Sequence, residues 1–463
     1  MSQKSSSRVF HIVSLGCSKN TVDSESMAAL MQREGYSSST NPDGADVLIV
    51  NTCGFIDAAK RESLDVLREL ASSKGEDQLL IAAGCLSQRY GSALVQEIAG
   101  LDGVIGTRRW MDIVPFVQKL RSRTKPEPMY HLPGEAKTVG RDEKGIIRVA
   151  VQGASAYLKI ADGCRRPCAF CAIPLIKGTQ VSRSKDLILR EALELQRAGI
   201  QELILISQDT TDYGHDLGLK NGLSDLLEGI TATATSIPWI RIMYAYPGYV
   251  TDRLIETMSS HPQILPYLDI PLQHAHRETL KRMRRPANIE WVNRTVEKLR
   301  RQMPGLAIRT TFIVGYPGET DEEFDTLMAF IREMRFDKVG VFTYSYEAST
   351  LSASVSWQVP DDIKEERRHA IMEVQQQISL EKNQELVGRT IPVLIEGFGD
   401  GISIGRSYRD APEIDGLVLV PGKLPLGEII PIRIDGAMAY DLTGYPEGTE
   451  QLVNIVGISS IAK

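Results

Sequence analysis

Asp162-Gly163-Cys164-Arg165-Arg166-Pro167-Cys168-Ala169-Phe170-Cys171 carries three cysteines at a C-x3-C-x2-C spacing. Thiolates this close together hold a metal ion or an iron–sulfur cluster. Three protein ligands on a cluster of four irons leave one iron with an open position, where a small molecule binds. A structural zinc site is the alternative, but zinc prefers four closed ligands, and the next histidine is His215. The stretch therefore predicts a four-iron cluster with one open iron.

The composition is that of an ordinary globular protein. The chain has 463 residues, with 42% hydrophobic and 24% charged, which predicts about three domains. The N-terminus lacks the apolar core of a signal peptide, and no apolar run approaches the ~18 residues of a membrane span. Six cysteines are too few for a disulfide scaffold, and a reducing compartment would keep them free for metal. We therefore expect a cytoplasmic protein with no membrane partner.

The first 125 residues read as a parallel α/β domain in which one arrangement occurs three times. Strands are expected at residues 8–15, 46–50 and 78–83, and each is followed by a cysteine: Cys17, Cys53 and Cys85. The cysteines are 36 and 32 residues apart, about the length of one strand–helix unit. Neighbouring parallel strands end at one edge of a sheet, so the thiols are expected to meet there. A single buried cysteine is often only a small hydrophobe, but three equivalent positions favour a second cluster.

The remaining chain divides into a linker and two further domains. Residues 126–155, rich in Pro, Gly and charge, are expected to be a linker, with an extra strand near 145–151. A central domain at 156–383 shows six strands alternating with helices, which predicts a partial (β/α)6 barrel with its site at the carboxyl ends of the strands. After a charged helix at about 361–388, residues 384–463 predict a small antiparallel β-barrel.

With these pieces in place the chain resembles the methylthiotransferases, a subclass of the radical S-adenosylmethionine (SAM) enzymes. The resemblance covers nearly the whole chain and rests on the central cysteine motif, on Ser14-Leu15-Gly16-Cys17-Ser18-Lys19-Asn20, Asn51-Thr52-Cys53 and Gly84-Cys85, and on Phe312-Ile313-Val314-Gly315-Tyr316-Pro317-Gly318-Glu319. It implies a radical SAM barrel and a C-terminal TRAM domain. It also implies two 4Fe-4S clusters, one on Cys164, Cys168 and Cys171 and one on Cys17, Cys53 and Cys85, with SAM on the open iron and Phe170 beside its adenine.

The resemblance further implies a radical reaction. Members of the family add a methylthio group to an unactivated carbon, and the β-hydrogen of an aspartate is too weakly acidic for a side-chain base. The reduced cluster would cleave SAM to a 5′-deoxyadenosyl radical that removes this hydrogen. The second cluster would hold the sulfur, and a second SAM would supply the methyl group. A low-potential electron donor of the flavodoxin or ferredoxin type and a sulfur donor are implied as partners of a monomeric enzyme.

Two features favour a ribosomal protein as substrate. Gln208-Asp209 and Gln273-His274-Ala275-His276 resemble the branch that modifies an aspartate of small-subunit ribosomal protein number twelve. The segment 385–463 holds six Lys or Arg and eleven Asp or Glu, a net charge of −5, which suits a basic protein better than RNA. The acidic charge alternatively serves only solubility. The same chemistry on transfer-RNA adenosine, and a non-enzymatic zinc protein that binds RNA or the ribosome, remain as alternatives.

The other candidate site residues are polar groups near the ends of the predicted strands. Gln208, Asp209, Gln273 and the turn at Gly315 are expected to contact SAM or substrate. Arg183 is expected to pair with a carboxylate, whose geometry the guanidinium fork matches. A purely structural role is an equal alternative for each of the polar residues.

Overall fold

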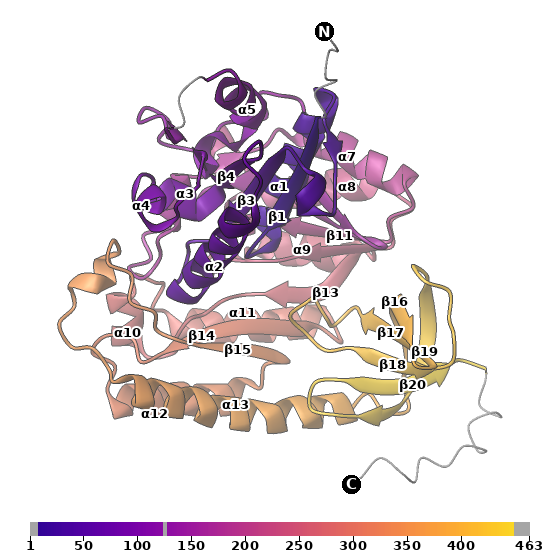
Figure 1. The fold of residues 1–463 in the computed structure, drawn as a ribbon. Coiled ribbons are helices and arrows are strands. Elements are labelled where there is room, and N and C mark those ends of the chain that lie inside the picture. The colour runs from indigo at the N-terminus through magenta and orange to yellow at the C-terminus, as the bar shows by residue number, and fades with distance from the viewer. Residues whose placement is uncertain (1–7, 124–126, 449–463) are drawn as a thin grey trace.

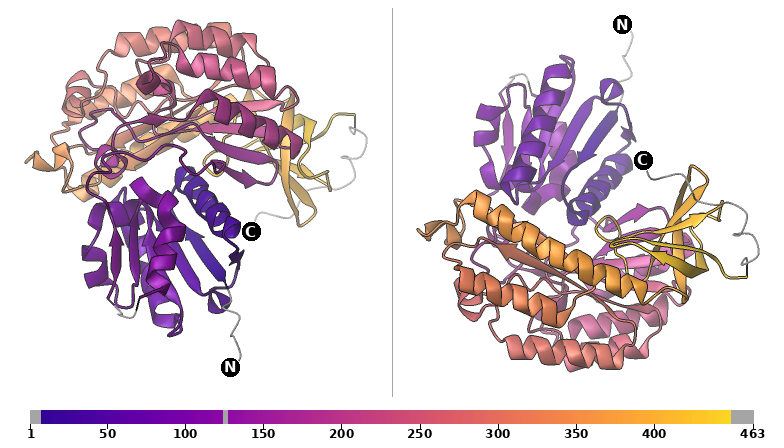
Figure 2. Two further views of the ribbon diagram at one scale, coloured as in Figure 1. Left: turned by 90° about the horizontal axis from the view of Figure 1, so that it is seen from above. Right: turned by 90° about the horizontal axis from the view of Figure 1, so that it is seen from below.

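The computed structural model describes residues 8–123 and 127–448. Two α/β units and a small barrel follow one another along the chain (Figure 1), and the first unit and the barrel contact different parts of the central unit (Figure 2). Among the described residues, no helix combines the length and the apolar character needed to cross a bilayer. The predicted domain ends at residues 125 and 463 lie outside the described residues.

The first unit is the predicted parallel α/β domain. Its sheet has the order β2-β1-β3-β4-β5-β6 and every pair is parallel. The three expected strands are β1 (Val9–Ser14), β3 (Val47–Thr52) and β4 (Leu79–Ala83), and three shorter ones widen the sheet: β2 (Ser37–Ser38), β5 (Gly103–Gly106) and β6 (Met129–His131). The helices are α1 (Ser18–Arg33), α2 (Asp57–Ser73), α3 (Gly84–Tyr90), α4 (Ala93–Glu97) and α5 (Ile113–Arg121).

Apolar side chains on both faces of the sheet explain this arrangement. All six residues of β3 are buried, as expected of a central parallel strand covered by helices on both sides. Leu64, Leu67 and Leu70 recur at helical spacing on α2 and pack with Leu48 and Val50 of the sheet. The buried strands therefore fix where the following loops, and the cysteines in them, emerge.

The central unit is an open, mostly parallel sheet, which confirms the partial barrel. Its strand order is β15-β14-β13-β12-β11-β8-β7, and the two outer strands do not pair with each other. Six parallel strands stand at the predicted places: β8 (Ser155–Lys159), β11 (Glu202–Ile206), β12 (Trp239–Ile242), β13 (Ile264–Asp269), β14 (Ala307–Val314) and β15 (Lys338–Thr343). Beside them run α6 (Ile173–Lys177), α7 (Lys185–Arg197), α8 (Gly222–Thr233), α9 (Asp252–Ser260), α10 (Arg277–Arg282), α11 (Ile289–Gln302) and α12 (Asp321–Met334). A small ladder joins β9 (Ala161–Asp162) to β10 (Val181–Ser182).

The segment expected to link the two units contributes a strand to each of them. Strand β6 joins the first sheet, and β7 (Val149–Gln152) pairs antiparallel with β8 at the edge of the second. The predicted extra strand is thus confirmed as β7. The described residues 127–155 therefore belong partly to the first sheet and partly to the second.

The long helix α13 (Asp361–Gln384) leads to a closed five-stranded barrel (Figure 1). Its strands are β16 (Thr390–Gly399), β17 (Ile402–Ser407), β18 (Val418–Pro421), β19 (Ile429–Ala437) and β20 (Leu442–Pro446). Four of the five pairs are antiparallel, as expected, and the barrel closes through one parallel pair, β18 with β20. Glu202 of β11, which is fully buried, anchors the barrel by pairing with Arg406 of β17 at 2.6 Å, and within the central unit it pairs with Arg241 of β12 at 2.7 Å.

Candidate active site

All six cysteines line a single cavity of about 480 Å³ between the first two units. The first group of three comes from the first unit and the second group from the central unit. The cavity is completed by polar, aromatic and apolar side chains, which are Lys19, Asn20, Phe55, Arg166, Phe170, Ile173, Lys177, Gln208, Tyr244, Ala245, Tyr246, Pro271, Gln273, Arg285 and Phe342. The two cysteine groups predicted from spacing therefore face a common space.

Parallel strands bring the first group together. Cys17 lies directly before α1, Cys53 directly after β3, and Cys85 in the first turn of α3, which follows β4. The backbone at Gly16 is so close to Cys53 that a Cβ there would lie 2.8 Å from the sulfur. Gly84 has a φ of +95°, and an added Cβ would lie 2.3 Å from Oδ1 of Asn51. Glycine is required at both positions because a side chain would displace the loops that carry the cysteines.

The second group lies on the loop that follows β9. The backbone amide of Arg166 donates to Sγ of Cys164 at 3.4 Å, and Arg285 donates to Sγ of Cys168 at 3.6 Å. The hydroxyl of Tyr246 lies 3.8 Å from the same Cys168 sulfur. Donors that point at thiolates stabilise the anionic form that binds iron, and they tune the reduction potential of a cluster held there.

The protonation of the thiols fits a site that is completed by a cation. Burial raises the pKa of Cys85, Cys164 and Cys171 to about 12, and burial likewise raises the pKa of Cys53. For Cys17, desolvation alone would raise the pKa, but the Lys19 charge and nearby backbone amides outweigh it and lower the pKa. Buried thiols of high pKa need positive charge to become thiolates, and iron bound by these cysteines would supply it.

The donor set of the cavity is the one that iron–sulfur clusters use. Among the residues that the structure describes, no group of three or more His, Cys, Asp or Glu side chains is placed to hold one metal ion. A cluster of four irons and four sulfides is bulkier than an ion and needs a wider space between its thiolates. Each group would supply three thiolates to such a cluster.

Three of the other predicted residues also line the cavity: Phe170, Gln208 and Gln273. Within the described chain, Oε1 of Gln208 is buried without a hydrogen-bond donor, so it is free to accept a bond from a bound molecule. Phe170 lies within the second cysteine group, immediately before Cys171.

Two predicted residues lie beside the cavity rather than on its wall. Asp209 is buried and accepts a hydrogen bond from Arg166 at 2.6 Å, and burial raises its pKa. Asp209 therefore fixes the side chain of Arg166, which lines the cavity. Gly315 has a φ of +67°, and an added Cβ would lie 2.1 Å from Cγ of Lys364, so the turn is shaped by its packing against α13.

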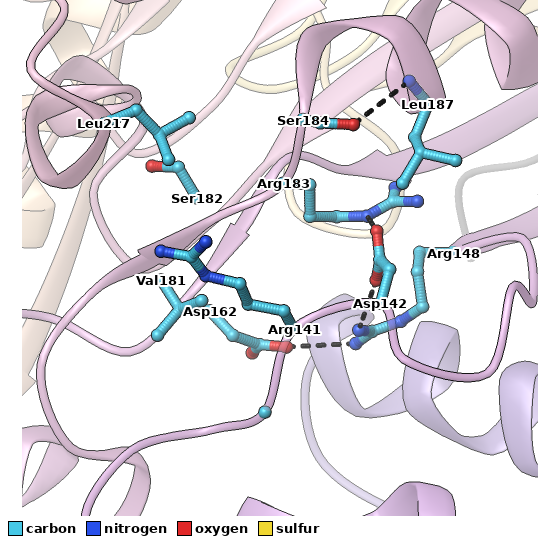
Figure 3. Close-up of a pocket in the computed structure, with 11 residues that line it drawn as sticks. Arg141, Asp142, Arg148, Asp162, Val181, Ser182, Arg183, Ser184, Leu187 and Leu217 are labelled. Atoms are coloured by element: carbon cyan, nitrogen blue, oxygen red, sulfur yellow. Dashed lines mark hydrogen bonds and ion pairs between the residues drawn. The ribbon is translucent and has the colours of Figure 1, made fainter.

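Arg183 belongs to a different, smaller pocket of about 200 Å³ (Figure 3). Its guanidinium pairs with Asp142 at 2.6 Å and with Glu191 at 2.6 Å, and Asp142 also approaches Arg148 at 3.7 Å. The predicted carboxylate partner is therefore present, but it is supplied by the protein itself. Arg183 does not reach the cavity that the six cysteines line.

Several cavity residues carry no clear signal in the sequence. Lys19 and Arg166 stand beside cysteines, yet an isolated basic residue in a loop or a first helical turn is usually solvated. Arg285 lies in the run Arg282-Met283-Arg284-Arg285, which reads as the surface end of a helix. Tyr246 follows β12 and stands where site residues are expected from the sequence, at a strand end, whereas Tyr244 was not singled out although it occupies the same strand end.

Comparison with known proteins agrees with this architecture. Residues 9–106 match the model described as Uncharacterized protein family UPF0004, residues 158–331 match the Radical SAM superfamily, and residues 387–446 match the TRAM domain. The solved structure of the radical SAM methyltransferase TsrM from Kitasatospora setae aligns with a TM-score of 0.54 at 13% identity, over 86% of this chain and 80% of that one. At that identity the likeness shows the fold alone.

Closer relatives cover nearly the whole chain. The ribosomal protein uS12 methylthiotransferase RimO of Chloroflexus aurantiacus is 48% identical, over 94% of this chain and 99% of the relative. The RimO of Roseiflexus sp. is 46% identical over 94% of this chain and 96% of the relative. This likeness decides against a non-enzymatic zinc protein. The chain belongs to the RimO family of radical SAM methylthiotransferases.

Proposed function

We propose that this protein adds a methylthio group to the β-carbon of an aspartate in ribosomal protein uS12, the protein on which its relatives are named as acting. The observation that carries the proposal is the single cavity lined by two separate groups of three cysteines. Adding sulfur to an unactivated carbon requires a radical source and a sulfur source at the same carbon. A cavity shared by both cysteine groups allows one substrate carbon to reach both.

The cysteine groups would hold the two 4Fe-4S clusters. When bound, the cluster on Cys164, Cys168 and Cys171 supplies the electron that cleaves SAM, and the one on Cys17, Cys53 and Cys85 supplies the sulfur position. The protein's own part is to bind and orient SAM and the substrate. Phe170, Gln208 and Gln273 are proposed to contact SAM, because they line the wall of the cavity contributed by the central unit.

Asp209, Arg183 and Gly315 are proposed to act indirectly, by positioning other residues. Asp209 fixes the guanidinium of Arg166, which also stacks on Tyr249 at 3.7 Å from the ring centroid. Arg183 holds Asp142 beside the buried charges at the boundary of the two units. The turn at Gly315 keeps the end of β14 packed against α13.

The proposal includes a division of labour along the chain and a set of partners. Residues 1–125 carry the sulfur-holding cluster, 156–383 perform the radical chemistry, and 384–463, with a net charge of −5, receive the basic ribosomal protein. The enzyme is proposed to work as a cytoplasmic monomer. A flavodoxin or ferredoxin supplies low-potential electrons, and a separate donor supplies sulfur.

The test uses the full-length protein reconstituted anaerobically with iron and sulfide. It is incubated with SAM, reductant and sulfide, together with uS12 in one reaction and unmodified transfer RNA in another, and both substrates are examined by mass spectrometry. A methylthio increment on an aspartate of uS12 is expected. An increment on the RNA alone would overturn the choice of substrate, and zinc in place of iron and acid-labile sulfide would overturn the chemistry.

A further inference from the structure

The charged side chains on the cavity wall are all of one sign. Of its lining residues, all of them in the described part of the chain, four are basic and none is acidic: Lys19, Arg166, Lys177 and Arg285. A confined site with charges of one sign attracts ligands of the opposite sign. The four residues differ, however, in how far the protein has already neutralised them.

Two of the four have carboxylate partners inside the protein. Arg166 pairs with Asp209 at 2.6 Å and with Asp212 at 3.0 Å. Lys177 pairs with Asp162 at 3.0 Å and with Asp23 at 3.1 Å. Each of these two buried cations is compensated by two carboxylates, so neither requires an external anion.

Arg285 contacts the second cysteine group, on the side of the cavity proposed to bind SAM. It donates to the carbonyl of Pro271 and to Sγ of Cys168, the latter at 3.6 Å, and its guanidinium lies 4.3 Å from the ring centroid of Tyr246. Its neighbours are therefore the second cysteine group and the wall proposed to hold SAM.

Lys19, like Arg285, has no carboxylate partner in the described part of the chain, and it also lacks the hydrogen-bond acceptors that Arg285 has. Lys19 is 9% exposed, and its ammonium lies 3.3 Å from the ring centroid of Tyr244. Within residues 8–123 and 127–448, no carboxylate lies within ion-pair distance of this ammonium and no hydrogen-bond acceptor is recorded for it. An ammonium has three donors, and a ring face satisfies its charge only in part. Such a group is suited to receive an anionic ligand.

Lys19 lies where the two units meet on the cavity wall. Lys19 follows Cys17 by two residues in the first unit, whereas Tyr244 follows β12 of the central unit. Tyr244 has a φ of +62°, and its backbone is held by Asp269 and Thr210. The Lys19 ammonium is thereby fixed at the boundary between the two cysteine groups. A carbon that loses hydrogen to one group's chemistry and gains sulfur from the other must lie at this boundary.

We propose that Lys19, seated on the ring of Tyr244, binds the carboxylate of the substrate aspartate and makes the enzyme specific for an acidic side chain. The inference rests on the proposed function, since it names the residue that recognises that substrate. A charge-assisted hydrogen bond from Lys19 holds the carboxylate and so presents the adjacent β-carbon to the cavity. An amide side chain at the same place would lack the charge that the ammonium needs.

The test compares uS12 with a uS12 variant in which the target aspartate is replaced by asparagine. Affinity for both is measured by fluorescence anisotropy with the reconstituted enzyme in the absence of reductant, for the wild type, Lys19→Met, Lys19→Gln and Lys19→Arg. A matched control is Lys60→Met, which removes a lysine 4.3 Å from the ring centroid of Tyr90 in the same unit, outside the cavity. Iron content and melting temperature are recorded for each protein.

The wild type is expected to prefer aspartate by about tenfold to a hundredfold, the range for a charge-assisted hydrogen bond. Compared at equal iron content, Lys19→Met and Lys19→Gln should lose this preference, Lys19→Arg should keep part of it, and Lys60→Met should keep all of it. An undiminished preference in both neutral variants, or an equal loss of affinity for both substrates, would overturn the assignment. If the wild type modifies RNA and not uS12, the proposed function fails first, and the wild-type reaction alone reveals it.

Discussion

Replacing Asp23 with asparagine is expected to weaken the contact between the first two units. Asp23 lies on α1 with 2% of its side chain exposed. Its carboxylate accepts from Arg148 at 2.5 Å and Lys159 at 2.7 Å, and from Lys177 at 3.1 Å. All three cations belong to later parts of the chain, so this one side chain ties the first unit to the central one. Part of this cluster of charges is drawn in Figure 3.

The expected cost follows from the burial of these charges. Asp162 would remain as the shared partner of the three cations, at 2.7 Å from Lys159 and 3.0 Å from both Lys177 and Arg148. Asp162 would then be the one carboxylate shared by all three buried cations, with Asp142 at 3.7 Å from Arg148 alone. Removing one partner of a buried ion pair costs about 3–5 kcal/mol, because the remaining charge is left uncompensated in a medium that solvates it poorly. We therefore expect the free energy of unfolding to fall by about that amount.

Anaerobic urea denaturation of the reconstituted Asp23→Asn protein, followed by fluorescence and circular dichroism, measures this loss. The control is Asp57→Asn, which removes a carboxylate from a surface pair with Arg61 at 2.6 Å in the same unit. An exposed pair of this kind contributes about 0–1 kcal/mol. If the two variants unfold at the same urea concentration, the buried cluster does not hold the units together and this reasoning is refuted.

Three further predictions concern the cysteines, a glycine and a buried glutamate. Cys168→Ser and Cys85→Ser should each lower iron and acid-labile sulfide by about half, since each removes a ligand of one cluster. Cleavage of SAM to 5′-deoxyadenosine should be lost only in Cys168→Ser, and its loss in both would contradict separate roles. Gly84→Ala should destabilise the first unit by more than about 1 kcal/mol, because its φ of +95° and its close contacts exclude a side chain, whereas Gly44→Ala, with open space around it, should change the melting temperature little. Burial by itself raises the pKa of Glu202, but two arginines outweigh it and lower the pKa from 4.5 to about 2. Its stabilising contribution is therefore fully present above pH 4.5 and is lost as the pH falls toward 2, so the stability difference between wild type and Glu202→Gln should shrink over that interval in urea titrations. A stability difference that stays constant from pH 7 to pH 3 would contradict a stabilising role for the ion pairs of Glu202 with its two arginines.

Much of this molecule is determined by local patterns in the sequence. The six central strands and the three first strands with their cysteines are visible because buried parallel strands are short apolar runs and helices repeat their apolar positions every third or fourth residue. The carboxyl ends of parallel strands share one edge, so the meeting of Cys17, Cys53 and Cys85 followed from their spacing. Gln208 and Gln273 were found by the same rule of strand ends, whereas Phe170 came from the resemblance of the cysteine motif to a known family.

What the sequence left open depends on which distant residues come into contact. Arg183 had the expected carboxylate partner, but only the tertiary structure shows that Asp142 and Glu191 supply it. The parallel closure of β18 with β20, and the entry of β6 into the first sheet, depend on pairing between segments that no local period specifies. The approach of Lys19 to Tyr244 joins residues 225 positions apart across two units. Such contacts are decided by how whole sheets pack, because the free energy of one pair is small beside that of the core that positions it.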